Sequence, residues 1–96
     1  MPVIVEMPAA LRQFAGDQDT LNSSGKTVEE VFSELCSTHP ELKKNLYGSD
    51  GKIRSFINIY INDEDIRYGQ GLDSPLKEGD RVQIVPSIAG GFGRQP

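Results

Sequence analysis

The sequence contains a single cysteine, no long apolar run and no excess of basic residues. One cysteine cannot form an internal disulfide, which suits a reducing compartment. No stretch approaches the ~20 apolar residues of a membrane span, and the first residues lack the basic and apolar regions of a signal peptide. Ten basic and fourteen acidic residues give 10 − 14 = −4, a field that does not attract nucleic acid or anionic membranes. We therefore expect a cytoplasmic protein that binds neither.

The chain is short enough to be one domain. It has 96 residues, of which 36% are hydrophobic and 25% charged, so a modest folded core is expected. A domain of this size buries only roughly 60–68% of the surface that its unfolded chain exposes. An enclosed active site with its own cofactor would use much of that interior. The composition therefore favours a small module that works with partners over a self-contained enzyme.

Short apolar runs predict five strands. The strands are expected over residues 3–7, 18–22, 56–61, 66–68 and 81–86. The run 56–61 is the clearest, because its isoleucines alternate with polar and aromatic residues. Ile57, Ile59 and Ile61 are expected to face the core, and Phe56 and Tyr60 to face the other side of the sheet.

One helix pattern separates the first two strands from the last three. Thr27 and Glu30 fit a capping box, in which the Thr27 hydroxyl accepts from the Glu30 amide and the Glu30 carboxylate accepts from the Thr27 amide. Apolar residues at helical spacing then predict a helix over 28–38. Pro40 either ends the helix or opens a second short helix that reaches residue 46.

This order of elements predicts an α+β fold of the β-grasp, ubiquitin-like type. It has a mixed sheet of four to five strands with one main helix packed on one face. One helix cannot cover both faces of such a sheet. The second face must therefore meet solvent or a partner.

Several short motifs indicate structure better than chemistry. Residues 24–27 lack the first glycine of a phosphate-binding loop, and 69–71 lack the third glycine of a dinucleotide fingerprint. Residues 63–65 lack the spacing of a calcium loop. Cys36 and His39 have no third orienting group and are too few to hold a metal. We therefore expect no catalytic residue, no metal site and no bound cofactor.

The segment Ile88-Ala89-Gly90-Gly91 is different, because it projects a small diglycine beyond the last strand. Two residues without Cβ atoms can thread a narrow channel into a partner's active site. A carboxylate at Gly91 could there be adenylated and attacked by a nucleophile. The alternative is an ordinary flexible tail, which is common at chain ends.

Residues 56–67 and 84–91 resemble the MoaD/ThiS family of ubiquitin-like sulfur carriers. The resemblance extends over 3–91, and 56–67 is similar to the branch that serves cysteine biosynthesis. It implies that an adenylyltransferase of the ubiquitin-activating type uses ATP to activate the Gly91 carboxylate, and that sulfur then replaces AMP. The resulting thiocarboxylate would donate sulfur to a cysteine-synthase-like enzyme. The chain would be a protein co-substrate and not an enzyme.

The chain departs from this family pattern after the diglycine. Residues 92–96 follow Gly91, whereas active members of the family end at that glycine. The resemblance implies a working carrier of residues 1–91 and an extension of 92–96 that a zinc metalloprotease of the JAMM type removes between Gly91 and Phe92. The alternatives are that the five residues are foreign to the natural chain or that the carrier function is lost.

The resemblance also implies a partner surface. Relatives dock their activating enzyme through the sheet face that the helix leaves open. On this chain that face is expected to show Ile4, Phe56, Tyr60 and Val85. Exposed apolar patches often mark such interfaces.

Other functions stay open at this point. The sulfur could go to molybdopterin, thiazole or tRNA, because the chemistry at Gly91 would be the same. The chain could also be a ubiquitin-like modifier joined to target lysines through Gly91. A third alternative is a β-grasp binding module whose tail carries no chemistry.

Overall fold

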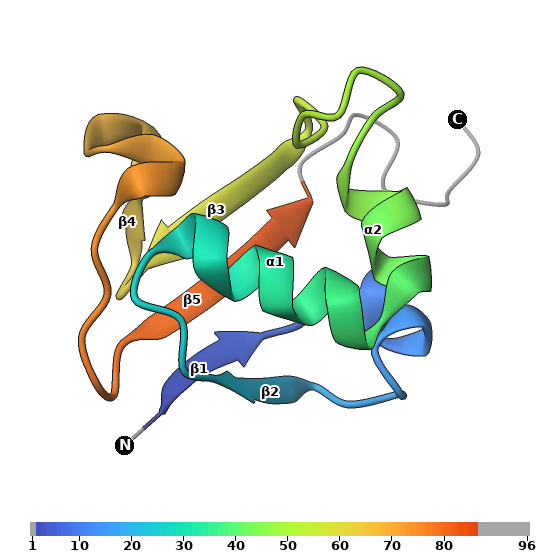
Figure 1. Cartoon of the computed structure of the whole chain (residues 1–96), viewed down its shortest axis with the longest axis horizontal. Coiled ribbons are helices and arrows are strands. Elements are labelled where there is room, and N and C mark those ends of the chain that lie inside the picture. The colour runs from blue at the N-terminus through green and yellow to red at the C-terminus, as the bar shows by residue number, and fades with distance from the viewer. Residues whose placement is uncertain (1, 87–96) are drawn as a thin grey trace.

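The computed structural model describes residues 2–86, which form a mixed five-stranded sheet with helices on one face (Figure 1). The order across the sheet is β2-β1-β5-β3-β4, so β5 is the central strand. β1 runs parallel to β5, and the other neighbours are antiparallel. The predicted β-grasp fold is confirmed. The strands are β1 (Val3–Glu6), β2 (Thr20–Ser23), β3 (Ile57–Ile61), β4 (Glu64–Asp65) and β5 (Arg81–Pro86).

Two α-helices follow one another, and Figure 1 shows α1 lying across the sheet with α2 at its far end. Pro40 opens the second helix, which the sequence had left as one of two alternatives. No helix within residues 2–86 has the length and apolar character needed to cross a bilayer. The helices are α1 (Val28–Thr38) and α2 (Pro40–Leu46), with 3-10 turns η1 (Ala9–Phe14), η2 (Ile66–Tyr68) and η3 (Gly71–Asp73).

The strand predicted over residues 66–68 is wrong, because these residues form η2. The chain does return from β3, but β4 holds only two residues. Asp65 ends the strand by capping the turn that follows, since its carboxylate accepts from the Arg67 amide at 2.8 Å. A short polar side chain at this position competes with the strand ladder for backbone bonds.

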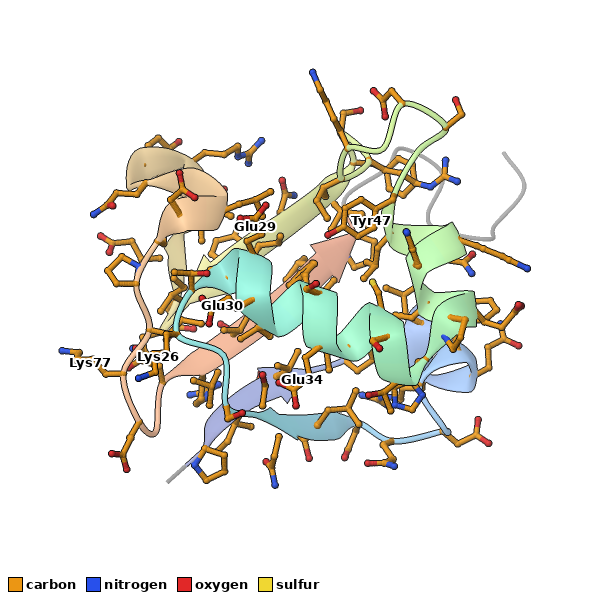
Figure 2. The ribbon with its side chains drawn as sticks, in the orientation of Figure 1. Lys26, Glu29, Glu30, Glu34, Tyr47 and Lys77 are labelled. Carbon is orange, nitrogen blue, oxygen red and sulfur yellow. The ribbon has the colours of Figure 1, made fainter. Side chains whose placement is uncertain are left out.

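The start of α1 is held by side chains from its own first turn and from β2. The Thr27 hydroxyl accepts from the Glu30 amide at 3.2 Å, as predicted. The Glu30 carboxylate accepts from the Lys26 amide at 2.9 Å, one residue earlier than the capping box predicts. Farther along the helix, the Ser23 hydroxyl donates to the Glu34 carboxylate at 2.6 Å. Figure 2 shows Glu34 pointing from α1 towards β2.

The core lies between α1 and the covered face of the sheet. Val5, Ile59 and Val82 come from adjacent strands and point inward, as their alternation predicts. Val31 and Phe32 of α1 are fully buried against them. The other sides of β1, β3 and β5 are therefore turned away from the helices.

Asp80 joins three parts of the fold at the start of β5. Its carboxylate accepts from the Lys77 amide at 2.8 Å and from the Asn62 side chain at 3.0 Å. Its backbone carbonyl accepts from the Ile4 amide at 2.9 Å. The hydrogen bond from the Lys77 backbone, followed by that from Asn62, holds the pKa of Asp80 below its ordinary value of 3.8.

We expect this lowered pKa to make the fold sensitive to acid. Because the folded-state pKa lies below the unfolded value, the stabilisation is present above the unfolded pKa and is lost as the pH falls through the folded one. The urea midpoint should therefore fall between about pH 5 and about pH 3. An Asp80→Asn variant should show a shallower fall, whereas Asp73→Asn, at an exposed aspartate, should keep the original slope. An unchanged slope in Asp80→Asn would contradict this account.

Candidate functional site

The central strand carries the chain towards the predicted diglycine. β5 is bonded to β1 on one edge and to β3 on the other, and its last residue, Pro86, lies opposite Ile57. The tail residues Ile88, Ala89, Gly90 and Gly91 lie outside the described residues, as does the proposed junction with Phe92. The part of the site that the structure places is therefore the end of β5 and the sheet face beside it.

Three of the four predicted partner-surface residues lie on the face that α1 leaves open. Ile4, Tyr60 and Val85 alternate with buried residues of β1, β3 and β5. Val85 is 39% exposed, a high value for an aliphatic side chain in a central strand. Their role in binding a partner stays a prediction.

Phe56 is placed differently from the other three residues. It lies just before β3, and its half-buried side chain packs against the core. The alternation that assigned it to the open face applies only inside a strand. The structure therefore groups Ile4, Tyr60 and Val85 without Phe56.

The centre of the open face is polar. Glu6 and Gln83 are direct neighbours in the register of β1 and β5, and Tyr60 is the next neighbour of Gln83 on β3. The Glu6 carboxylate accepts from Arg81 Nε at 2.7 Å and from Gln83 Nε2 at 3.1 Å. The bond from Arg81 is the main reason why the pKa of Glu6 lies below its usual value. A hydrogen-bonded cluster thus separates Ile4 from Val85.

Sequence reasoning missed this cluster. Glu6, Arg81 and Gln83 lie in the predicted strands 3–7 and 81–86 and belong to no motif. Their contact joins residues 75 apart along the chain and depends on the parallel pairing of β1 with β5. A signal was present, since all three occupy outward positions of strands that a β-grasp fold places side by side.

A hollow of about 410 Å³ lies where β5 ends. Val85 and Pro86 of β5 line it together with Arg12 of η1, and Glu6 and Asp19 line it as well. Arg12 is exposed, and its Nε donates to the Met7 carbonyl at 3.1 Å. The hollow beside the end of β5 therefore contains both basic and acidic side chains.

The structure adds no support for a metal site or a reactive cysteine, which the sequence had argued against. Across residues 2–86, no three histidine, cysteine or acidic side chains lie close enough together to hold a metal. Cys36 is half-buried, and burial raises the pKa of its thiol, which disfavours the reactive thiolate. His39 lies between the two helices, where its amide donates to the Leu35 carbonyl at 2.8 Å.

Comparison with known proteins identifies the family. The model of the ThiS family matches residues 5–91. The chain belongs to the ThiS family. Like other members, it is a ubiquitin-like β-grasp protein. The match covers β1 to β5 and continues through the diglycine.

Individual relatives are similar over nearly the whole chain. Sulfur carrier protein CysO of Mycobacterium tuberculosis is 40% identical over 93 residues, which are 95% of this chain and 100% of that protein. CysO of Amycolatopsis orientalis, solved in complex with BexX, matches with a TM-score of 0.83 and 38% identity, covering 93% of this chain and 99% of that one. Small archaeal modifier protein 1 of Methanosarcina acetivorans matches with a TM-score of 0.83 and 34% identity, covering 93% and 95%.

Proposed function

We propose that this chain is a sulfur carrier that delivers sulfur as a thiocarboxylate on Gly91. The observation that carries the proposal is the similarity to CysO, a protein named as a sulfur carrier, over the full length of that relative. The family match ends at Gly91, which supports this glycine as the working end of the domain. The same match supports a division into a working domain of residues 1–91 and an extension of residues 92–96.

The proposed chemistry needs two steps at one carbon. A carboxylate oxygen of Gly91 attacks the α-phosphorus of ATP and pyrophosphate leaves, which gives an acyl-adenylate. A sulfur nucleophile then attacks the carbonyl carbon, a C–S bond forms, the C–O bond to AMP breaks and a thiocarboxylate remains. Both steps take place in an adenylyltransferase of the ubiquitin-activating type. The chain is their co-substrate, and ATP binds to the partner and not to this chain.

The fold supports this role by fixing the position from which the tail starts. β5 pairs with β1 over residues 81–83 and with β3 over residues 82–86, so its end is fixed against β3. Ile4, Tyr60 and Val85, with the polar cluster between them, form the face that we propose for docking the adenylyltransferase. Apolar side chains beside charged hydrogen-bonding groups supply contact area and a defined orientation.

We propose that the sulfur is used in cysteine biosynthesis. A cysteine-synthase-like enzyme would bind the molecule that accepts the sulfur. The similarity to CysO supports this proposal. The solved complex of CysO with BexX shows that a protein of this name binds another protein. Molybdopterin, thiazole and tRNA thiolation are the alternative acceptors. Feeding the thiocarboxylate form to each acceptor enzyme and following sulfur transfer separates them.

We further propose that residues 92–96 are removed before the first step. While Phe92 follows Gly91, the Gly91 carbonyl is part of a peptide bond and offers no carboxylate to ATP. A JAMM-type zinc metalloprotease is the proposed processing enzyme. Intact-mass measurement of the protein from its native cell should give a chain that ends at Gly91, and a mature mass that includes residues 92–96 would exclude processing.

A second candidate function is conjugation to other proteins. The similarity to small archaeal modifier protein 1 favours it, since that protein is named as a modifier. In this case the activated Gly91 would form an isopeptide bond with a lysine of a target. A ladder of larger conjugates in cells would support the modifier function, and a thiocarboxylate on the free protein would support the carrier function.

The deciding experiment compares two lengths of the same chain. A version that ends at Gly91 is incubated with a candidate adenylyltransferase, ATP and sulfide, and its intact mass is measured. We expect the mass change of one oxygen replaced by one sulfur. The 96-residue chain, in which Gly91 has no free carboxylate, should stay unchanged. If the shorter chain is also unchanged with adenylyltransferases of every acceptor pathway, the carrier proposal is wrong.

A further inference from the structure

In the described part of the chain, one edge of β3 has no neighbouring strand along part of its length, although Ile57 and Ile59 on that edge are themselves only 7% and 3% exposed. β5 pairs with β3 from Ile57 to Ile61, whereas β4 on the other edge pairs only with Tyr60 and Ile61. Among residues 2–86, no strand continues this second edge beside Ile57 and Ile59. Open strand edges readily pair with an added strand.

The register shows which backbone groups face this open edge. Asn62 donates its amide to the Arg81 carbonyl at 2.9 Å, so every second residue of β3 exchanges bonds with β5. Ile57 and Ile59 are the intervening residues, and their backbone groups point the other way. The Ile57 amide donates a hydrogen bond to the Arg54 carbonyl at 3.0 Å. The Ile57 carbonyl and the Ile59 amide then face the open edge, where an added strand would bond.

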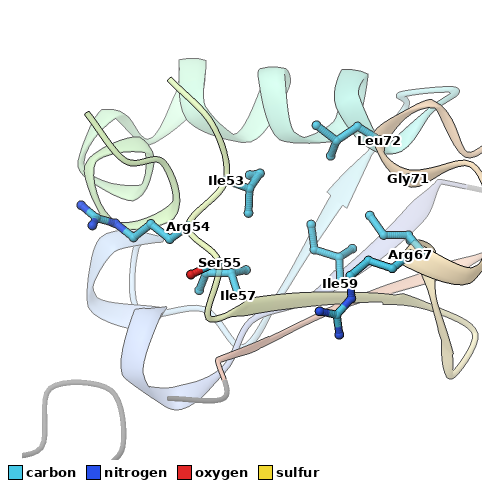
Figure 3. Close-up of a pocket in the computed structure, with 9 residues that line it drawn as sticks. Ile53, Arg54, Ser55, Ile57, Ile59, Arg67, Gly71 and Leu72 are labelled. Atoms are coloured by element: carbon cyan, nitrogen blue, oxygen red, sulfur yellow. The ribbon is translucent and has the colours of Figure 1, made fainter. Parts of the chain in front are cut away.

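An apolar pocket of about 380 Å³ lies along the same edge. Figure 3 shows Ile53 and Leu72 on one side of it and Ile57 and Ile59 on the side of the sheet. Ile66 of η2 also lines it. An extended peptide points alternate side chains to one side, so a strand added here could place an apolar side chain in this pocket.

The chain beside one wall of the pocket has more basic than acidic residues, although the whole chain is acidic. Residues 41–54 contain Lys43, Lys44, Lys52 and Arg54 against Glu41 and Asp50, which gives 4 − 2 = +2 in a chain of net charge −4, and Lys44 is ion-paired with Glu41 at 3.1 Å. Arg54 lines the pocket, and its guanidinium donates to the Lys44 carbonyl at 3.1 Å, a bond that leaves its charge unneutralised. This local charge favours an acidic ligand.

We propose that this edge of β3 binds an extended acidic segment of a partner protein by strand addition. The segment bonds to the Ile57 carbonyl and the Ile59 amide, inserts an apolar side chain between Ile53 and Leu72, and places a carboxylate near Arg54. A second copy of this chain is a poorer occupant, because pairing two such edges brings two basic segments together. The site differs from the open sheet face, so a partner held here leaves that face accessible.

The test uses the full chain labelled with ¹⁵N and a seven-residue peptide of alternating aspartate and valine. We expect the NMR chemical shifts of the Ile57, Ile59 and Leu72 amides to change most when the peptide is added. Hydrogen exchange of the Ile59 amide should slow at least about tenfold because of the new hydrogen bond. Two control peptides separate the contributions. One is N-methylated at the pairing amides and the other has lysine in place of aspartate, and neither should slow exchange at Ile59.

Variants of the chain then test the charge. Arg54→Glu should weaken binding of the acidic peptide at least about tenfold and accept the lysine peptide in its place. Lys77→Glu makes the same charge change at an exposed residue outside the pocket and should bind as the original chain does. Equal binding of the N-methylated peptide, or shifts elsewhere, would overturn strand addition. Concentration-dependent shifts at Ile59 without peptide would overturn it in favour of a second copy.

Discussion

Replacing Tyr60 by glutamate should lower the rate of thiocarboxylate formation about 30-fold or more without unfolding the domain. Tyr60 lies half-exposed on the open face of the central sheet, next to Gln83, which is bonded to Glu6. Tyrosines at the centre of an interface often carry about 2 kcal/mol or more of binding free energy, which corresponds to about 30-fold. A carboxylate at this position also adds negative charge beside Glu6 and Asp65. The rate is measured by intact mass over time, with thermal unfolding as the check on stability.

Tyr68→Glu is the matched control for this prediction. It makes the same chemical change at a tyrosine that is 88% exposed and lies on η2, outside the strands that form the open face. Its rate should equal that of the unmodified chain. If both variants are equally slow, net charge and not the open face governs activation. If Tyr60→Glu unfolds, the milder Tyr60→Ser should still slow the reaction, and a normal rate in that folded variant would refute the docking face.

The layout of the fold could be predicted because local patterns agree with one another. The alternation in 56–61 and 81–86, and the helical spacing in 28–38, each indicate one buried face. A β-grasp fold is a compact way to bury those faces against each other. Thr27 predicted the first residue of α1 correctly. Its side chain accepts a hydrogen bond from the helix backbone, and such a cap can be recognised from the local sequence.

The errors fall where a local pattern is overruled by its surroundings. Residues 66–68 were expected to form a short strand that returns after β3, but the capping bond from the Arg67 amide to Asp65 makes them a 3-10 turn. Phe56 was assigned to the open face by extending the alternation of β3 one residue too far. Its ring packs against the core because the chain leaves strand geometry before residue 57.

The candidate site was predicted in its apolar part and missed in its polar part. Ile4, Tyr60 and Val85 follow from alternation within single strands, which the sequence contains. The bonds from Arg81 and Gln83 to Glu6 depend on which strands are neighbours and in which register, and that is decided by the whole sheet. The same holds for the open edge of β3, which exists because β4 stops after two residues.

Gly25 shows a requirement for glycine that the sequence does not reveal. In the sequence it reads as part of a turn, where glycine is favoured for its backbone freedom. The structure gives it no positive φ angle. Instead, a Cβ atom built at this position would lie 2.7 Å from the Val31 backbone nitrogen and 2.8 Å from the Val31 Cγ2 atom. Glycine is needed here because β2 leads into α1 through a very close approach.

Gly25→Ala should therefore destabilise the domain by about 1–3 kcal/mol, the usual range for forcing an extra carbon into a packed site. The obstacle is helix backbone at Val31, which cannot swing aside as a flexible side chain can. For a domain of this size the melting temperature should fall by about 4–8 °C per kcal/mol. Gly48→Ala is the control, since its new Cβ comes within 3.2 Å of the Asp50 carboxylate, at the end of an exposed side chain, and meets backbone only at the ordinary contact distance of 3.8 Å from the Lys52 carbonyl. An equal loss in both variants would mean that chain flexibility, and not the contact with α1, determines the cost.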